Sequence, residues 1–369
     1  MGSESEPTFL GRRIREARER MNWSQTRLAE AAKFGSAQTI STIENGTRDV
    51  KAYELARIAD VLHLSLNALL SQTDETSAAV QWRDRPTEDF EEVEARFLLR
   101  CERFATLESL CGVPSCEPLP KLTLRALDYA IAARAADELR NKLQLGSRPA
   151  CSLAKTLDED WGVKLFVDDL GEKGSGLCAS GTFGQAVLLN SRNAASRRNF
   201  TLAHELFHLL MPDPQNNAGE IERYANAFAS ALLLPAEPLL LSCDSKSSGG
   251  KLSFESIVSI AVEFGVSTDA LLWRLVNLRR IRRESVESAI SSRVLKAIER
   301  SSQPQSSYQT SALPDRYVRL AYQAFRLGKI GLAKLAEFLE QGMFELAAQQ
   351  DLQPEMEHGE QAEIAVVGC

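Results

Sequence analysis

Two histidines and a glutamate lie within one short apolar stretch of the chain, residues 199–210. His204 and His208 are four residues apart, and Glu205 directly follows the first of them. Positions i and i+4 of a helix share one face, so two neutral imidazoles there could bind one tetrahedral Zn²⁺ ion. The Glu205 carboxylate would project to the edge of that face, where it could take a proton from a water molecule. Because the whole chain has only 4 histidines, chance is a weak explanation for this pairing.

The spacing His-Glu-x-x-His on a helix is typical of zinc peptidases, and it predicts a metal centre in this chain. In the alternative, both histidines are hydrogen-bonded inside a core helix and bind no metal. A catalytic zinc also needs a third protein ligand and one position left open for water. The sequence must therefore supply another ligand from a neighbouring element.

The helix predicted next in the chain, over residues 220–234, carries candidates for that third ligand. Glu222 and Asn226 are four residues apart, so both can face the metal helix. We expect Glu222 to bind the metal and Asn226 to orient a ligand through a hydrogen bond. Glu220 lies two residues away, on roughly the opposite side of the helix, and is the alternative ligand.

A second pattern, near the N-terminus, has no connection with metal chemistry. Ser24 is placed to cap a helix from Gln25 to Lys33, and Ser36 to cap a second helix that Asn45-Gly46 ends. The second helix carries small and amide side chains near its start. A short helix, a tight turn and such a second helix form the geometry that enters the major groove of DNA.

Over residues 9–70 the chain resembles the Cro-like, Xre-type helix-turn-helix family. The resemblance implies that residues 36–44 form the recognition helix and that the protein binds double-stranded operator DNA. The residues that would contact DNA are Gln25, Ser36, Ala37, Gln38, Thr39, Ser41, Asn45 and Arg48. Of these, Gln38, Ala37 and Ser41 would meet base edges. Gln25, Asn45 and Arg48 would bind phosphates.

The charge of this N-terminal region is only mildly positive, since residues 9–71 hold ten Lys/Arg against seven Asp/Glu. We therefore expect modest non-specific affinity, so that tight binding needs two copies of the chain. In the alternative, these helices serve only protein contact or dimerisation.

The metal helix and its successor resemble the ImmA/IrrE family of metallopeptidases, which are zincins. The resemblance covers roughly residues 122–278 and includes residues 186–190, which look like the strand before the metal helix. It implies that His204, His208 and Glu222 bind Zn²⁺ and that Glu205 is the general base. One position departs from the family, because Phe207 stands where glycine is usual. We expect its ring to pack beside the site and narrow it.

The fold class predicted from these segments is mainly α with a small β-sheet. It combines a five-helix N-terminal helix-turn-helix domain, an α+β zincin-like domain and a helical C-terminal extension. Short strands are expected at 163–167, 176–180 and 185–189, and a long helix over 122–143. The predicted boundaries are 9–71 for the DNA-binding domain, 72–120 for a linker and connecting helix, 121–285 for the peptidase domain, 286–350 for the extension and 351–369 for a polar tail.

Three stretches between these segments also carry expectations. Residues 72–90 are polar and acidic, as a linker would be. The apolar positions of residues 91–110 keep helical spacing, which predicts a connecting helix that could also form a homodimer. Residues 242–250 are expected to be a flexible loop. The linker of residues 301–311, rich in serine and glutamine, should precede a last helical pair over 314–348.

Composition limits the classes of protein that this chain could be. The net charge of −7 argues against nucleic-acid binding along the whole length, although one basic module remains compatible with it. Seven scattered cysteines without a Cys-x-x-Cys pair fit a reducing compartment. No apolar run approaches a membrane span, and the N-terminus has no signal-peptide pattern. We therefore expect a cytoplasmic protein with no membrane partner.

Together these patterns predict a DNA-binding transcriptional regulator that carries a zinc endopeptidase. By family resemblance the substrate would be a repressor or antitoxin-like protein, and cleavage of the chain itself is a variant. One alternative is a DNA-binding repressor whose zinc domain senses a ligand or partner and cuts nothing. Another is a toxin–antitoxin component that acts by interaction alone.

Overall fold

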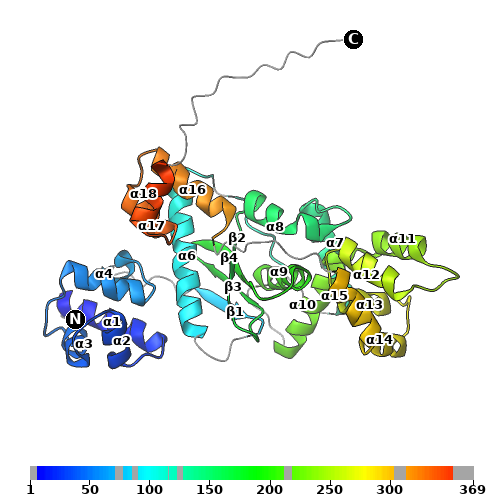
Figure 1. Cartoon of the computed structure of the whole chain (residues 1–369), viewed down its shortest axis with the longest axis horizontal. Helices are drawn as coiled ribbons and strands as arrows, with labels where there is room; N and C mark the ends of the chain where they lie inside the picture. Colours follow the sequence, from blue (N-terminus) through cyan, green and yellow to red (C-terminus); the bar gives the residue numbers. More distant parts are fainter. Residues whose placement is uncertain are drawn as a thin grey trace, which may run out of the picture. The chain divides into compact units, whose positions relative to one another are not determined.

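The computed structural model describes residues 6–70, 78–84, 90–114, 116–122, 128–211, 218–302 and 313–351. It is mainly helical with one small sheet, as the sequence predicts (Figure 1). The chain divides into two compact units. One unit comprises described residues 106–113 and 315–351, and the other holds the remaining described residues.

The N-terminal region consists of five helices, which confirms the predicted fold class for this part of the chain. Its helices are α1 (Glu6–Arg20), α2 (Gln25–Ala31), α3 (Ala37–Glu44), α4 (Ala52–Val61) and α5 (Leu66–Leu70). The Ser24 hydroxyl caps α2 by accepting from the Arg27 amide at 3.1 Å. Helix α2 ends earlier than expected, and Lys33 takes a left-handed conformation with φ +56° in the turn that follows.

Helix α3 starts where the sequence places it, but its cap differs from the expected one. The Ser36 hydroxyl lies 3.3 Å from Thr39 Oγ1 and makes no hydrogen bond to a helix amide. At the other end, Gly46 has φ +68°, and Thr47 N donates to Thr42 O at 3.0 Å, as a glycine cap requires. A Cβ at Gly46 would also come within 2.9 Å of Thr8 Cα, so α3 can end here only with glycine.

A buried ion pair links α1 to α3 inside this region. Arg18 Nε donates to Glu44 Oε1 at 2.7 Å, and Gln25 Nε2 donates to Glu44 Oε2 at 2.8 Å. Burial opposes ionisation of Glu44, but the hydrogen bonds from Arg18 and Gln25 outweigh it and lower the pKa of the carboxyl. The fully buried Ile14, together with Ile40, forms the apolar core around this pair.

Four strands form the sheet, in the order β1-β3-β4-β2. They are β1 (Ala79–Trp82), β2 (Lys164–Asp168), β3 (Gly176–Gly181) and β4 (Gly184–Asn190). Strands β2 and β4 are parallel, and the other neighbours are antiparallel. Strand β1 corrects the prediction of a linker over residues 72–90. The strand has only four residues, Ala-Val-Gln-Trp, and the polar composition of the longer stretch around it hid it.

The two faces of the sheet pack against different helices (Figure 1). Val187 and Leu189 join the core beneath α9 (Ala195–Leu210), and the alternating Ala186 and Leu188 are buried as well. On the other face, Phe166 meets Phe97 and Phe104 of α6 (Phe90–Leu110), with ring centroids 5.8 and 6.0 Å apart. Part of the apolar side of α6 is therefore used within the chain, and dimerisation through this helix stays a prediction.

Helices surround α9 on its side away from the sheet. They are α7 (Tyr129–Lys142), α10 (Ala218–Leu233), α11 (Ala236–Lys246), α12 (Phe254–Glu263), α13 (Thr268–Asn277), α14 (Arg283–Ile290) and α15 (Arg293–Ser302). Between α7 and β2 lie a 3₁₀ turn (Pro149–Cys151), α8 (Leu153–Lys155) and a π turn (Thr156–Asp160). Helix α11 corrects the prediction of a loop from residue 242, because the helix continues to Lys246. Leu122 lies outside any helix, and α7 begins only after Asp128 caps it.

The C-terminal unit contains three helices rather than the predicted pair. They are α16 (Asp315–Arg326), α17 (Leu332–Phe338) and α18 (Met343–Asp351). Arg316 pairs with Glu108 at 2.6 Å, and the Tyr317 hydroxyl donates to Phe338 O at 3.0 Å. Helices α14 and α15 belong to the other compact unit, and the domain boundary at residue 286 stays a prediction. Nearly all of the predicted polar tail, and most of the linker before α16, lies outside the described residues.

The described cysteines are all free thiols, as expected. Burial raises the pKa of Cys101 and Cys178 well above the usual value, which keeps both as neutral thiols.

Within the described residues no single helix is long and apolar enough to cross a membrane. Two pairs of helices, each bent at a short break, meet the length and composition of a membrane span only when each pair is taken together.

We expect Arg18→Met to lower the free energy of unfolding of the N-terminal region by about 2 kcal/mol at pH 7, because it removes two hydrogen bonds to the buried Glu44 carboxylate and leaves it only Gln25 and the longer contact to Arg15 at 3.4 Å. The pKa of Glu44 is lowered in the folded state, so its stabilising effect is present above the unfolded value of about 4.3. That effect is lost as the pH falls through the folded pKa. The difference between wild type and variant should therefore shrink below roughly pH 4 in calorimetric unfolding scans.

Arg12→Met is the matched control, since the pair of Arg12 with Glu16 is about half exposed. It should cost less than about 1 kcal/mol. Equal costs for the two variants, or a pH-independent cost for Arg18→Met, would contradict a stabilising role for the buried pair.

Candidate metal centre

Helix α9 places His204 and His208 on one face, as the sequence predicts. Every residue from Thr201 to Leu210 is buried, so the helix runs through the core. The two Nε2 atoms are 3.2 Å apart. Two imidazole nitrogens this close, both turned the same way, are suited to share one cation.

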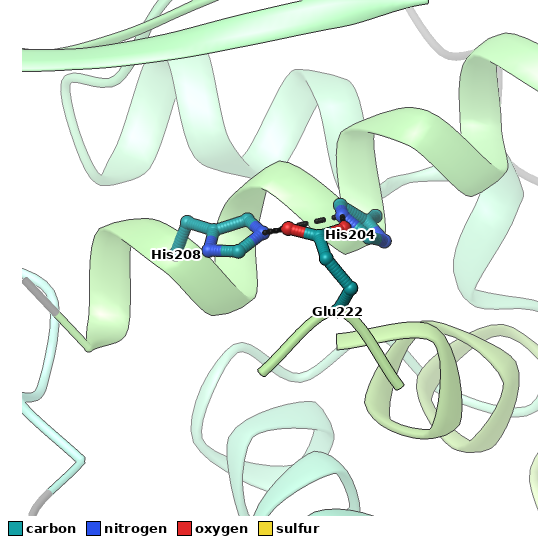
Figure 2. A group of neighbouring side chains, drawn as sticks. All are labelled: His204, His208 and Glu222. Carbon is teal, nitrogen blue, oxygen red and sulfur yellow. Dashed lines mark hydrogen bonds and ion pairs between the residues drawn. The ribbon is translucent and has the colours of Figure 1, made fainter. Parts of the chain in front are cut away.

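Helix α10 brings Glu222 to the two imidazoles (Figure 2). Glu222 Oε2 lies 3.1 Å from His204 Nε2, and Glu222 Oε1 lies 3.4 Å from His208 Nε2. Burial raises the pKa of Glu222, but the hydrogen bonds of the two histidines outweigh it and lower the pKa well below its usual value. The carboxylate is therefore ionised, as a metal ligand must be.

Asn226, one turn further along α10, contacts the other nitrogen of His204. Its Oδ1 lies 3.1 Å from His204 Nδ1. If the proton is on Nδ1, that nitrogen donates to Asn226 and leaves Nε2 as an acceptor facing Glu222. Burial has the largest effect on the pKa of His204 and lowers it, which favours the neutral ring that a metal needs.

Glu205 lies beside the two histidines but has an unusual environment for a carboxylate. It is fully buried, and neither oxygen has a hydrogen-bond partner within bonding distance among the described residues. Burial raises its pKa to about 7, although His208 and the Cys178 thiol act in the opposite direction. An unpartnered buried carboxylate is costly unless a ligand or water completes it, which makes Glu205 a candidate functional residue.

The donor set passes a test of fit for zinc. One atom from each of His204, His208 and Glu222 lies within 4.8 Å of the others. Two imidazole nitrogens and one carboxylate oxygen are the protein ligands of many catalytic zinc sites, which keep a fourth position for water. The orphaned Glu205 carboxylate lies next to this set, where a proton acceptor for that water is needed.

The alternative ligand does not reach the histidines. Glu220 is half exposed and pairs instead with Arg223 on its own helix, at 3.8 Å. A period of 3.6 residues turns Glu220 away from the face that carries Glu222 and Asn226. The structure thus brings together Glu222 and the two histidines and leaves Glu220 outside.

The Phe207 ring packs beside the site, as expected, but from within the core. Its side chain is fully buried, and its ring packs on Phe228 at 5.4 Å and edge-on to His208 at 6.0 Å. The residue fills the core behind His208. Tyr224, the nearest tyrosine to the ligands in sequence, packs its ring on Tyr129 at 5.9 Å.

One residue of the site was missed by the sequence. Arg83 follows β1, and its Nη1 donates to Thr201 Oγ1 on α9 at 3.0 Å. The sequence predicts a linker over residues 72–90, and no motif in that stretch singles out Arg83. Only the pairing of β1 with β3, which the sequence does not reveal, brings Arg83 to the metal helix.

The residues predicted to read DNA bases are at least partly accessible on α3. Ser36 and Gln38 are exposed, while Ala37, Thr39 and Ser41 are partly exposed. Ile40 and Ile43 point into the core and fix the orientation of the helix. The accessible face of α3 is thus the one that carries the small and amide side chains.

The three residues predicted to bind phosphates each hold a partner within the chain. Gln25 donates to Glu44, and Arg48 Nη2 donates to Glu54 Oε1 at 2.8 Å. Asn45 Oδ1 accepts from Arg15 Nη2 at 2.6 Å. These contacts orient the side chains around the ends of α2 and α3, and phosphate contact by them stays a prediction.

Comparison with known families agrees with both resemblances. Residues 158–276 match the IrrE N-terminal-like domain, and residues 10–70 match a helix-turn-helix domain. The chain is therefore a fusion of a helix-turn-helix domain with an IrrE-like domain. The first of these domains makes it a DNA-binding regulator.

Similar solved structures are distant. A transcriptional regulator of Mycobacterium tuberculosis is 16% identical with a TM-score of 0.31, and the match covers 49% of this chain and 53%, about half, of that one. PlcR of Bacillus thuringiensis, solved with the peptide PapR7 and DNA, is 14% identical with a TM-score of 0.17, over 94% and 98% of the two chains. No curated protein matches the chain.

Glu222→Gln should weaken Zn²⁺ binding by about 100-fold or more, because it removes the charge and one ligand oxygen, whereas second-shell changes cost about 10- to 100-fold. Glu220→Gln, two residues away, is the matched control and should bind Zn²⁺ as the wild type does. Competition with a coloured chelator measures both affinities on the full chain. The ligand assignment is wrong if the two variants weaken binding equally.

Proposed function

We propose that this DNA-binding regulator carries a zinc-dependent endopeptidase in its IrrE-like domain, and that it cleaves a repressor or antitoxin-like protein. The observation that carries the proposal is the buried, unpartnered Glu205 beside a set of two histidines and a carboxylate. A purely structural metal site would have no use for that carboxylate. The choice of substrate follows from the family resemblance and from the fusion to a DNA reader.

Zinc, when bound by His204, His208 and Glu222, would acidify a water molecule and polarise the scissile carbonyl as a Lewis acid. The chain's own contribution centres on Glu205. Its carboxylate accepts the proton from water while the water oxygen forms the new bond to the carbonyl carbon. Glu205 then delivers the proton to the amide nitrogen as the C–N bond breaks, so that water is divided between the two products.

The environment of Glu205 suits this exchange. Burial raises its pKa to about 7, so the group can both take up and release a proton near neutral pH. Asn226 holds His204 through Nδ1, which keeps the opposite nitrogen directed at the ligand set. The buried helix α9 fixes the positions of both imidazoles and the base together.

Glu222 is the most accessible residue of this centre. His204 and Glu205 are fully buried and His208 is 8% exposed, whereas the Glu222 side chain is 41% exposed. We therefore expect a peptide to approach over α10. The near closure of the centre also favours a second candidate function, in which the zinc domain senses a ligand or partner and cuts nothing.

DNA recognition is proposed to use the accessible face of α3. Gln38 is the most exposed amide on that face and is placed to contact a base in the major groove. Ser36, Ala37, Thr39 and Ser41 would lie beside it, and two copies of the chain would contact the two halves of an operator. The small net charge of the domain fits binding that depends on sequence more than on phosphate attraction.

Glu205→Gln should lower peptide cleavage by about 10³-fold, because the amide cannot accept the water proton. Zinc content and operator affinity should stay at wild-type levels, since neither the ligands nor α3 change. Zinc analysis, DNA binding and mass spectrometry of a candidate substrate measure the three properties. Unchanged biological output together with wild-type zinc content would favour the sensor.

Gln38→Ala should cost about 1–3 kcal/mol of binding to the specific operator, since one bidentate base contact is worth this much. Affinity for unrelated DNA should not change. Asn67→Ala, an exposed amide on α5, is the control and should leave both affinities unchanged. Fluorescence anisotropy with the two DNA sequences tests this. A uniform loss on both sequences would argue that Gln38 reads no base.

A further inference from the structure

The backbone fixes Arg83 beside the metal helix. Its amide donates to Gly176 O at 3.1 Å, which continues the pairing of β1 with β3 by one residue. The next residue, Asp84, accepts from the Ser175 hydroxyl at 2.6 Å, and Arg197 of α9 donates to the same hydroxyl at 2.9 Å. The start of the Arg83 side chain is therefore held by contacts to β3 on both sides of it.

The guanidinium of Arg83 lies along the face of α9 that carries the general base. Nη1 donates to Thr201 Oγ1 at 3.0 Å, and Thr201 and Glu205 are four residues apart, one turn along the same face. Strand β3 approaches α9 closely here, because a Cβ at Gly176 would lie 2.7 Å from Thr201 Cγ2. This close approach brings the residue after β1 within reach of the helix.

The charge of Arg83 acts on the centre. Its anchor on Thr201 places the guanidinium about one helical turn from Glu205 along α9. Burial lowers the pKa of Arg83 itself, against the attraction of Glu205 and Glu222. Arginine nevertheless stays protonated at neutral pH. A fixed positive charge thus stands within electrostatic range of the base and the metal ligands.

Peptide hydrolysis places negative charge on the carbonyl oxygen, and a hydrogen-bond donor aimed at that oxygen speeds the reaction. Tyr224, the other donor near the ligands in sequence, packs its ring on Tyr129. Arg83 offers five N–H donors in a planar fork, and the bond to Thr201 engages one nitrogen. The side chain is anchored at that nitrogen and retains donors for a substrate.

We propose that Arg83 donates to the carbonyl oxygen of the scissile bond and stabilises the negative charge that develops there. The inference rests on the proposed peptidase function. The role of Arg83 also explains why β1 belongs to this sheet. Pairing of β1 with β3 places the positive charge of Arg83 beside the metal helix. The segment between the two domains is thus part of the catalytic apparatus.

The test uses the full chain loaded with Zn²⁺, and a peptide library made by digesting a bacterial proteome as the probe. For a peptide that the wild type cleaves, Arg83→Met should lower kcat by about 100-fold and change KM by less than about threefold. Arg83→Lys should lose less, since it keeps a charge but not the fork. Arg192→Met is the control, because Arg192 pairs with Asp169 on the surface, and it should behave as wild type.

Two readouts separate a role in the reaction from a structural one. Guanidinium chloride at millimolar concentration should restore part of the activity of Arg83→Ala, which a folding defect would not allow. Zn²⁺ affinity and the unfolding temperature of Arg83→Met should equal those of the wild type. A rise in KM at constant kcat, the absence of rescue, or a loss of zinc would overturn the assignment.

The outcomes also separate this inference from the proposed function. If the wild type cleaves and Glu205→Gln does not, but Arg83→Met cleaves as the wild type does, only the role of Arg83 fails. If the wild type cleaves no peptide of the library, or Glu205→Gln cleaves equally well, the peptidase function fails and the role of Arg83 fails with it.

Discussion

The convergence of three donor atoms from two helices is the constraint on which the rest of the domain depends. Two imidazole nitrogens 3.2 Å apart and a carboxylate 3.1 and 3.4 Å from them would be hard to hold in an apolar core without a cation. The packing of α10 on α9 positions Glu222, and Asn226 fixes the ring of His204. The sheet, in turn, supports α9 through Val187 and Leu189. The fold can be understood as a frame that buries the two imidazoles and brings the partly exposed Glu222 carboxylate to them.

The same frame explains why a carboxylate with a raised pKa persists beside the donors. Glu205 is buried because α9 is buried along its whole second half, and a helix cannot turn one side chain out without moving His204 and His208 as well. Burial disfavours the charged form of Glu205, and this raises its pKa to about 7. The position of α9 between the sheet and α10 therefore determines both the arrangement of the two histidines and the raised pKa of Glu205.

The sequence predicted the parts of this site that depend on local spacing. Residues four apart on one helix share a face whatever surrounds them, so His204 and His208, and separately Glu222 and Asn226, could be paired in advance. Packing between helices is not encoded so directly: the sequence left Glu220 as an alternative ligand, and the structure shows that Glu222 is the one that reaches the histidines. Strand β1 could not be found, because its residues are held by backbone pairing to a strand almost one hundred positions further on. Arg83 was missed for the same reason.

In the N-terminal region, too, the sequence predicts the local features but not the contacts between helices. Apolar spacing and the Asn-Gly pair located α3, yet the partners of Gln25, Asn45 and Arg48 depend on which helices meet in three dimensions. Glu44 collects contacts from Arg18 and Gln25 because it faces inward at the end of α3, which its charge alone would not suggest.

X-ray absorption spectroscopy at the zinc edge of the purified full chain tests the central claim most directly. Two imidazole ligands and further oxygen ligands, with Zn–N distances of about 2.0 Å and no sulfur in the first shell, are the predicted result. A chain that takes up no zinc, or one whose zinc is bound by cysteine sulfur, would contradict a metal centre built from His204, His208 and Glu222.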